Sequence, residues 1–293
     1  MPNGTALTTG SSGLLAWGCD DRARLWAAVQ SPGGGWGAWM ELAAPPGGCM
    51  ARPTALRLAA GPISLLIVTR GGTIWQRTFG TRADCEPEPV EAADAAASAG
   101  GVRAPVADTS SDGGLAACLG HAWTSLEGEA ATPPAAIVDS AGRLQLMVVG
   151  HDGVLRSRAQ SMPSDAADES AVSALARTAL LPWLPWETLP VVARGSPRAL
   201  LKSNAAHLGE FFVRGADGGL LQLRRVPQSL RGARGHSEKG AASPNASAGW
   251  EVTRLGGAFA SGPVAALNVR GDATLSHPTC PYAPASRRYR VGR

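Results

Sequence analysis

The side chains best suited to chemistry in this sequence are tryptophans, of which there are nine against four Phe and two Tyr. An indole face stacks on the apolar C–H face of a sugar ring, and its N–H can donate to a hydroxyl group. Five of the tryptophans belong to a repeated W-x-x-W pattern that is complete in two copies and half kept in a third: Trp36, Trp39, Trp183, Trp186 and Trp123. These five are the candidate carbohydrate contacts, and Arg214 and His151 complete the candidate set.

The same tryptophans also have a structural interpretation. A Trp that recurs at one position of a repeat commonly wedges neighbouring sheets together, and we favour this role for the four that recur: Trp39, Trp123, Trp186 and Trp250. Trp36 and Trp183 occur in only some copies. For these two, ligand contact and packing are both open.

Catalytic motifs are missing from the sequence. The five histidines are scattered singly, without an H-x-x-x-H or H-E-x-x-H pair for a metal. There is no G-x-S-x-G elbow, no phosphate-binding loop and no S-x-D-x-G-x-T-W turn of the sialidase type. Asp152 and Asp217 lie in predicted hairpin turns, where Asp bonds to the turn backbone. We therefore predict that the protein is not an enzyme and uses no metal and no cofactor.

An internal repeat must position the tryptophans. The unit W-x-x-W-x-x-L occupies 36–42 and 183–189, and partial copies lie at 121–126 and 249–255. Each unit is followed by a proline, and these are Pro53, Pro133 or Pro134, Pro197 and Pro263. Repetition of one pattern along the chain indicates a repeat architecture.

Predicted β-hairpins follow the first three prolines. Apolar runs on both sides of a Gly-Gly or Asp-Gly pair occur at 63–75, 142–155 and 209–220. Such pairs indicate hairpins because tight turns need positive φ. A further hairpin at 13–30 has no W-x-x-W unit before it, and the last unit, from Trp250, lacks a clear hairpin after it.

A repeat of about 45 residues with about four short strands is typical of a β-propeller blade. We predict one all-β propeller domain over 1–293 with about four to five recognisable blades. The ring is either closed by strands from both termini or truncated from a larger wheel. The blade segments are 13–79, 121–160, 183–226 and 249–275. Low-complexity inserts, predicted to be disordered, occupy 80–120, 161–180 and 227–248, and a basic tail occupies 276–293.

In this sequence W-x-x-W-x-x-L is followed by Pro and then by a stretch close to the pattern G-x-L-x-V-F-V-x-G-x-D-G-x-L. This arrangement resembles the repeat of the bacterial fucose-binding β-propeller lectins of the seven-bladed type. The resemblance covers about three-fifths of the chain and is best from Trp183 to Leu223. It implies a propeller whose blades bind sugars in shallow sites between them, through aromatic rings and polar groups. This chain departs from the family in blade number, in its long inserts and in the outer Trp of two copies, where Gly120 and Ala248 stand.

Three functional hypotheses follow. The first is non-catalytic, lectin-like carbohydrate binding of the fucose type, which we favour. The second is a scaffold that binds protein partners in a larger assembly, and the third is an accessory domain of a longer hydrolase. Lectins gain avidity from several equivalent sites, whereas the copies here differ at the outer Trp. The sequence leaves the oligomeric state open.

Composition narrows the partners and the location. The net charge is +4 and only 17% of residues are charged, with no basic stripe that carries interleaved aromatics, so a nucleic-acid partner is not favoured. No apolar run approaches the roughly 18 residues of a membrane span. The first residues lack the charged and apolar regions of a signal peptide. We expect a cytoplasmic location unless the chain is a fragment of a secreted protein.

The cysteines are predicted to be free thiols. There are five, an odd number, and they are spread singly along the chain: Cys19, Cys49, Cys85, Cys118 and Cys280. None forms a C-x-x-C pair, which argues against a zinc site or a disulfide framework.

Overall fold

The structure is a computed structural model that describes residues 5–9, 14–31, 33–58, 62–79, 122–139, 143–161, 181–201, 209–226, 249–257, 264–267 and 273–276. Within these ranges the chain forms strands β1 to β17 and no helix, and the paired strands are antiparallel. The all-β prediction is confirmed. Apart from single boundary residues, the predicted inserts and basic tail lie outside the described residues, as do Cys85, Cys118 and Cys280.

The first two sheets are meanders in which each strand pairs with the next along the chain. The first contains β1 (Thr5–Thr9), β2 (Leu14–Cys19), β3 (Leu25–Val29) and β4 (Met40–Leu42). The second contains β5 (Thr54–Arg57), β6 (Ile63–Val68), β7 (Thr73–Phe79) and β8 (Thr124–Glu129). A four-stranded meander is the unit of a propeller blade, and we call these sheets blade 1 and blade 2.

Two further blades share one long strand. Blade 3 contains β9 (Ala135–Val138), β10 (Leu144–Val149), β11 (Val154–Ala159) and the first half of β12 (Glu187–Leu201). Blade 4 contains the second half of β12, β13 (Gly209–Gly215), β14 (Leu220–Arg225) and β15 (Trp250–Gly256). The pairing of β12 with β13 is irregular between Arg194 and Arg198, where the strand passes from one blade to the other.

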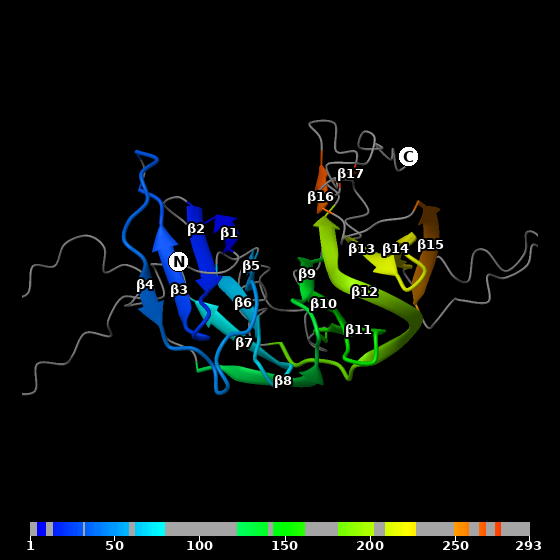
Figure 1. Cartoon of the computed structure of the whole chain (residues 1–293), viewed down its shortest axis with the longest axis horizontal. Coiled ribbons are helices and arrows are strands. Elements are labelled where there is room, and N and C mark those ends of the chain that lie inside the picture. The colour runs from blue at the N-terminus through cyan, green and yellow to red at the C-terminus, as the bar shows by residue number, and fades with distance from the viewer. Residues whose placement is uncertain are drawn as a thin grey trace, which may run out of the picture.

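The blades are arranged in an open arc (Figure 1). The first strands of successive blades contact one another in chain order: β1 with β5, β5 with β9, β9 with β12, and β12 with β16 (Val264–Leu267). Strand β16 forms a hairpin with β17 (Ala273–Ser276), which Figure 1 places across the mouth of the arc from blade 1. Ring closure is not seen among the described residues, because blade 1 has four strands of its own and none pairs with a C-terminal strand.

The prolines of the repeat begin the blades. Strands β5, β9 and β16 start directly after Pro53, Pro134 and Pro263, and pairing of β12 with β13 resumes directly after Pro197. Proline is tolerated at a strand start because no ladder hydrogen bond is needed there. The prediction that the last unit lacks a hairpin was wrong, since β16 and β17 follow it. The turn between them, 268–272, lies outside the described residues. The prediction missed this hairpin because the sequence there has no Asp-Gly or Gly-Gly pair between long apolar runs.

Each unit W-x-x-W-x-x-L ends a blade. The repeated Leu lies in the last strand of each blade, at Leu42, Leu126, Leu189 and Leu255. Each predicted segment from Trp to hairpin therefore straddles the boundary between two blades.

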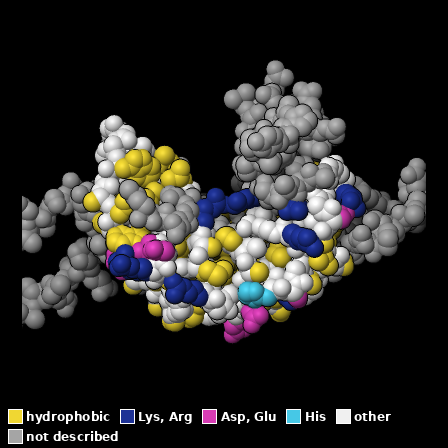
Figure 2. All heavy atoms as spheres, in the orientation of Figure 1, with side chains coloured by type: hydrophobic (Ala, Val, Ile, Leu, Met, Phe, Trp, Pro, Cys, Tyr) yellow, Lys and Arg dark blue, Asp and Glu magenta, His cyan; other side chains and the backbone are white. Residues whose placement is uncertain are grey.

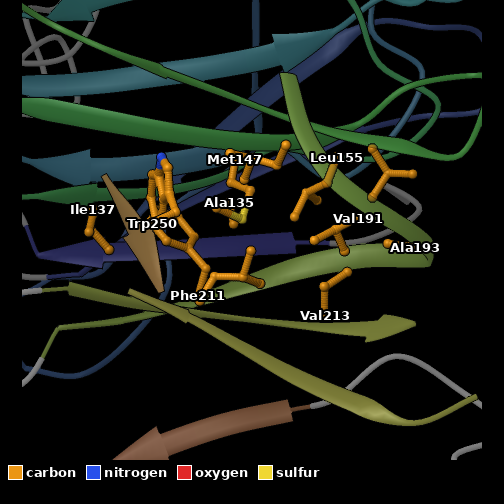
Figure 3. Packing of buried hydrophobic residues seen from close by; sticks show 12 residues of the cluster. Ala135, Ile137, Met147, Leu155, Val191, Ala193, Phe211, Val213 and Trp250 are labelled. Atoms are coloured by element: carbon orange, nitrogen blue, oxygen red, sulfur yellow. The ribbon is translucent and has the colours of Figure 1, made fainter. Parts of the chain in front are cut away.

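The core lies between the blades. The second strands of blades 2 and 3 are buried on both faces, which explains why their sequences are continuous apolar runs rather than alternating ones. In β6, Leu65 and Ile67 face blade 1, whereas Leu66 faces blade 3. Figure 3 shows the cluster between blades 3 and 4, where Phe211 and Trp250 meet with ring centroids 5.8 Å apart.

Aspartates organise the hairpin turns, as predicted. Asp152 Oδ1 accepts from the Val154 amide at 3.0 Å, and Asp217 Oδ1 accepts from the Gly219 amide at 2.9 Å. Hydrogen bonds from the Arg156 side chain, and from the Val154 amide, hold the pKa of the Asp152 carboxyl below its usual value.

Asp20 makes the densest of these turns in blade 1. Its carboxylate accepts from the amides of Arg22 and Arg24 at 3.0 and 2.8 Å, and from the Trp26 indole at 3.0 Å. The Arg24 guanidinium also binds it at 2.7 Å. Burial alone raises the pKa of Asp20, but the Arg24 amide, the Trp26 indole and the Arg24 guanidinium outweigh it and lower the pKa to about 2.

We expect Asp20→Asn to destabilise the protein at neutral pH and to matter less in acid. A lowered pKa means that the carboxylate's contribution to stability is present above the ordinary pKa of 3.8 and disappears as pH falls towards about 2. Urea unfolding of both proteins at pH 7, 4 and 2 measures this. A stability difference that stayed constant down to pH 2 would contradict it.

Cys19 and Cys49 form a disulfide, so the prediction of free thiols was wrong for this pair. Cys19 lies on β2 and Cys49 in the link between blades 1 and 2, 30 residues later, with the two Cα atoms 5.7 Å apart. Both are 1% exposed and belong to the cluster between these blades. The packing of this link against β2 brings them together, and their sequence spacing carries no sign of it.

Candidate functional site

An indole N–H closes each of the three seams between successive blades. Trp123 donates to the Ala43 carbonyl of blade 1 at 2.8 Å, and Trp186 donates to the carbonyls of Leu126, at 3.0 Å, and Glu127 in blade 2. Trp250 donates to Glu187 Oε2 of blade 3 at 3.1 Å. In the same way Trp183 donates to Gln76 Oε1 of blade 2 at 2.9 Å. These tryptophans hold neighbouring blades together, which confirms the structural interpretation of Trp123, Trp186 and Trp250.

Arginines stack on the seam tryptophans. The Arg158 guanidinium lies 5.9 Å from the ring centroid of Trp183 and 5.6 Å from that of Trp186. It also donates to the carbonyls of Leu184 and Leu126. Between blades 1 and 2, Arg77 lies 5.8 Å from the Trp123 ring. Burial lowers the pKa of Arg158, and Glu127 opposes this shift.

A hollow with polar and apolar walls opens on the seam between blades 3 and 4. It is lined by Gln145, Ser157, Arg158, Ala159, Leu184, Pro185, Glu187, Arg225 and Trp250. Its volume of 60 Å³ is about that of two waters, so a larger ligand would cover the hollow rather than enter it whole.

Glu187 is the chemically distinctive group of this hollow. Its Oε2 accepts from Trp250 at 3.1 Å and from the Ser157 hydroxyl at 3.4 Å. Its Oε1 is buried and has no hydrogen-bond partner among the described residues. A buried carboxylate oxygen without a donor is costly. A ligand that brings a hydroxyl or N–H to Oε1 would remove that cost.

The corresponding positions in the other seams differ. In blade 3, Glu187 of the last strand pairs with Ser157. The equivalent pairs are Thr124 with Gln76 in blade 2 and Met40 with Ala27 in blade 1. Among the described seams, only that between blades 3 and 4 has a carboxylate at this position.

The structure distributes the predicted site residues over several places. Trp183 and Trp186 lie together with Arg158, and Trp123 lies on the neighbouring seam. Trp36 is 48% exposed and Trp39 is half-buried, both on blade 1. Arg214 is on β13, and His151 is in an exposed turn against Gly72 of blade 2. The predicted residues therefore do not converge on one site.

Sequence reasoning missed the residues of the hollow. Glu187 directly follows the second Trp of its unit, where the units at 36–42 and 121–126 have Met40 and Thr124. The last unit also has a Glu at this place, Glu251, so the carboxylate was an available signal but not a unique one. Arg225 ends β14, and its guanidinium has no ion pair or hydrogen bond among the described residues. In blade 3, Trp186 directly precedes Glu187, the residue that pairs with Ser157. At the equivalent pair of blade 4, Thr253 faces Gln222 and is preceded by Val252, so Trp250 stands two positions earlier in its strand than Trp186 does. This shift carries its indole to Glu187.

Two further findings concern the described residues alone. They contain no group of three or more His, Cys, Asp or Glu side chains that could hold a metal ion. They also contain no helix of the length and apolarity needed to cross a membrane.

Four-stranded meanders stacked in an arc define a propeller-type repeat protein, and solved structures of that kind are similar to this chain. No protein-family model matches the sequence, and no curated protein matches it. AofleA from Arthrobotrys oligospora is 9% identical with a TM-score of 0.45, over 87% of this chain and 56% of that one. The chain thus spans little more than half of AofleA.

Two other structures are described as lectins. SapL1 lectin in complex with alpha methyl fucoside is 7% identical with a TM-score of 0.46, over 100% of this chain and 80% of that one. A mutant Aleuria aurantia lectin in complex with alpha-methyl-L-fucoside is 10% identical with a TM-score of 0.31, over 99% and 95% of the two chains. Similarity at this level assigns no function.

Proposed function

We propose that this protein binds carbohydrate without catalysis, in the manner of a lectin, at the hollow between blades 3 and 4. The observation that carries the proposal is the buried Glu187 Oε1, which has no donor among the described residues. It lies beside the Trp250 indole and shares its hollow with Arg225.

The chemistry of the hollow suits a neutral sugar. A carboxylate oxygen accepts from a sugar hydroxyl, and a guanidinium donates to a neighbouring hydroxyl oxygen. Leu184 is 41% exposed at the rim and offers apolar surface to a ring face or a methyl group. A deoxy sugar of the fucose type, with hydroxyls on one side and a methyl group on the other, matches this division.

Binding rather than hydrolysis is the proposed activity because the described lining contains one carboxylate. Most glycosidases need a pair, one as acid and one as base or nucleophile.

Exposed tryptophans offer a second contact to the same class of ligand. Among the predicted residues, Trp36 has the most accessible indole, and sugar stacking there remains part of the proposal. The indole N–H groups of Trp123, Trp183 and Trp186 are engaged by the protein, so these residues would contribute ring faces only.

We expect fucosylated glycans on an array to bind the wild-type protein and to bind Glu187→Gln about 10- to 100-fold more weakly. Loss of one hydrogen bond to a charged group costs about 1.5–3 kcal/mol, and each 1.4 kcal/mol is tenfold. Titration calorimetry on the best glycan gives the two dissociation constants.

Glu251→Gln is the matched control. Glu251 is an exposed carboxylate that pairs with Arg224 at 3.1 Å and does not line the hollow. It should bind as the wild type does. A folded wild-type protein that bound no glycan would exclude the proposed function, and unchanged binding by Glu187→Gln would exclude the hollow as its site.

A further inference from the structure

One short segment of blade 3 forms part of the wall of two different seams. It contains residues 183–187, and we call it the shared segment. Trp183 and Trp186 point into the seam with blade 2, where their indoles donate to acceptors of that blade. Leu184 and Glu187 line the hollow in the seam with blade 4. A displacement of the shared segment on one side of blade 3 therefore moves the site on its other side.

Arg158 holds the shared segment from the side of blade 2. It lies on β11 directly after Ser157, which pairs with Glu187. Its Nε donates to the Leu184 carbonyl at 2.6 Å, and its Nη1 donates to the Leu126 carbonyl of blade 2. Its guanidinium also stacks on both tryptophans of the shared segment. One side chain thus ties the middle of the shared segment to the neighbouring blade.

The contacts of Glu187 inside the hollow are few. Its Oε2 accepts from Trp250 at 3.1 Å and from the Ser157 hydroxyl at 3.4 Å, and the second distance is at the long end for a hydrogen bond. Its Oε1 has no donor, and the carboxylate forms no ion pair among the described residues. The position of this carboxylate therefore depends on the backbone that carries it, which is the shared segment.

We propose that Arg158 is a positioning residue, which holds Glu187 in the hollow from the opposite side of blade 3. The proposal rests on the proposed function of the hollow and deepens it. A binding site keeps its geometry when the residues behind it fix the residues that touch the ligand. Trp183 and Trp186 then contribute to binding without contact with the sugar, because they act through the segment that carries Glu187.

Blade 4 shows which replacement of Arg158 the fold accepts. Ser157 and Gln222 hold equivalent positions, since each pairs with the last strand of its blade at the same place. Leu223 follows Gln222 and therefore stands in blade 4 where Arg158 stands in blade 3. It packs in the cluster between blades 3 and 4. Arg158→Leu should keep apolar packing in its seam while it removes both hydrogen bonds to the carbonyls.

Arg77→Leu is the matched control. Arg77 holds the same position in blade 2, because it follows Gln76, which pairs with Thr124. It lies 5.8 Å from the Trp123 ring centroid, in the seam between blades 1 and 2, and does not line the hollow. Both variants should unfold at a lower urea concentration than the wild type, and only Arg158→Leu should change the hollow.

Titration calorimetry with the best fucosylated glycan from the array compares the variants under conditions where each is folded. Arg158→Leu should raise the dissociation constant by about tenfold, the lower end of the loss seen when a supporting residue is removed behind a metal ligand. Arg77→Leu should bind as the wild type does, although it too is less stable. Wild-type affinity in Arg158→Leu would overturn the proposal.

Arg158→Lys separates position from charge. A lysine keeps the positive charge but lacks the planar fork that stacks on the rings and reaches two carbonyls, so this variant should also bind more weakly than the wild type. On the face that Figure 2 shows, Lys and Arg side chains are spread along the arc, so the charge of that face does not depend on a single residue. Wild-type affinity in Arg158→Lys would overturn positioning in favour of an effect of charge alone.

A measurement without ligand separates this proposal from the proposed function. The Trp250 indole N–H donates to Glu187 Oε2, so its proton–nitrogen correlation signal in an NMR spectrum reports the position of that carboxylate. The signal, assigned with Trp250→Phe, should shift in Arg158→Leu and stay in place in Arg77→Leu. An unchanged signal in Arg158→Leu would overturn the proposal. A shifted signal in a protein that binds no glycan would exclude the proposed function and still support the positioning of Glu187 by Arg158.

Discussion

Reduction of the Cys19–Cys49 disulfide is expected to lower the free energy of unfolding by about 3–4 kcal/mol. The bond closes a loop of 30 residues, and the loss of loop entropy in the unfolded chain is of this size for such a loop. The two sulfurs lie in the cluster between blades 1 and 2, so the bond also holds the link between these blades against β2. Unfolding in urea with and without a reductant measures the difference.

The double variant Cys19→Ala, Cys49→Ala is the control. It should unfold at the urea concentration of the reduced wild type, and reductant should leave it unchanged. Thiol titration of the denatured wild type should count no more than three free cysteines, because five are present and Cys19 and Cys49 are paired. Equal stability of the oxidised and reduced wild type would contradict the prediction.

Trp186→Ala is expected to destabilise the seam between blades 2 and 3 by about 3 kcal/mol, at the lower end of the range for Trp truncation, since Trp186 is half-buried. The variant removes the hydrogen bond to Leu126 and the stacking partner of Arg158. It also exposes part of the cluster that contains Leu126 and Val148. Trp186→Phe keeps the ring and should cost about 1 kcal/mol, the usual net contribution of a hydrogen bond.

Gly128 provides a second variant for the same contact. A Cβ on Gly128 would lie 2.6 Å from Trp186 Nε1, so Gly128→Ala should itself cost about 1–3 kcal/mol through overpacking. Because the two residues touch, the double variant with Trp186→Ala should be more stable than the sum of the single effects predicts. Urea unfolding of the four proteins gives the coupling. Strict additivity would show that the indole does not rest on Gly128.

Local pattern was enough to predict the strands and hairpins. The apolar runs at 63–68 and 144–149 became fully buried strands, and Asp-Gly at 152–153 and 217–218 became turns whose glycines have positive φ. The recurrent Trp also predicted its role as a wedge between sheets. These features depend on a few neighbouring residues, and burial on both faces leaves a continuous apolar run that is readable without the tertiary structure.

The candidate site could not be read in this way. Trp183 finds its acceptor in Gln76, 107 residues earlier, and Trp250 finds Glu187, 63 residues earlier. Such partners are set by the stacking of blades. The sequence shows two extra residues between Trp250 and Leu255, but only the structure shows that this offset carries the indole to Glu187. The sequence pointed to the W-x-x-W tryptophans, whereas the structure assembled Glu187, Arg225 and Trp250.

By itself the sequence determined a chain of antiparallel hairpins, each unit ending in a Trp and Leu strand and followed by a proline, because strand periodicity and turn chemistry are local. Only the tertiary structure decided that β12 serves two blades, that Cys19 meets Cys49, and that no described strand from the C-terminal part of the chain pairs with blade 1. Each of these depends on contacts between residues far apart in the chain. Such contacts form from the geometry of stacked sheets, which spacing along a sequence does not record.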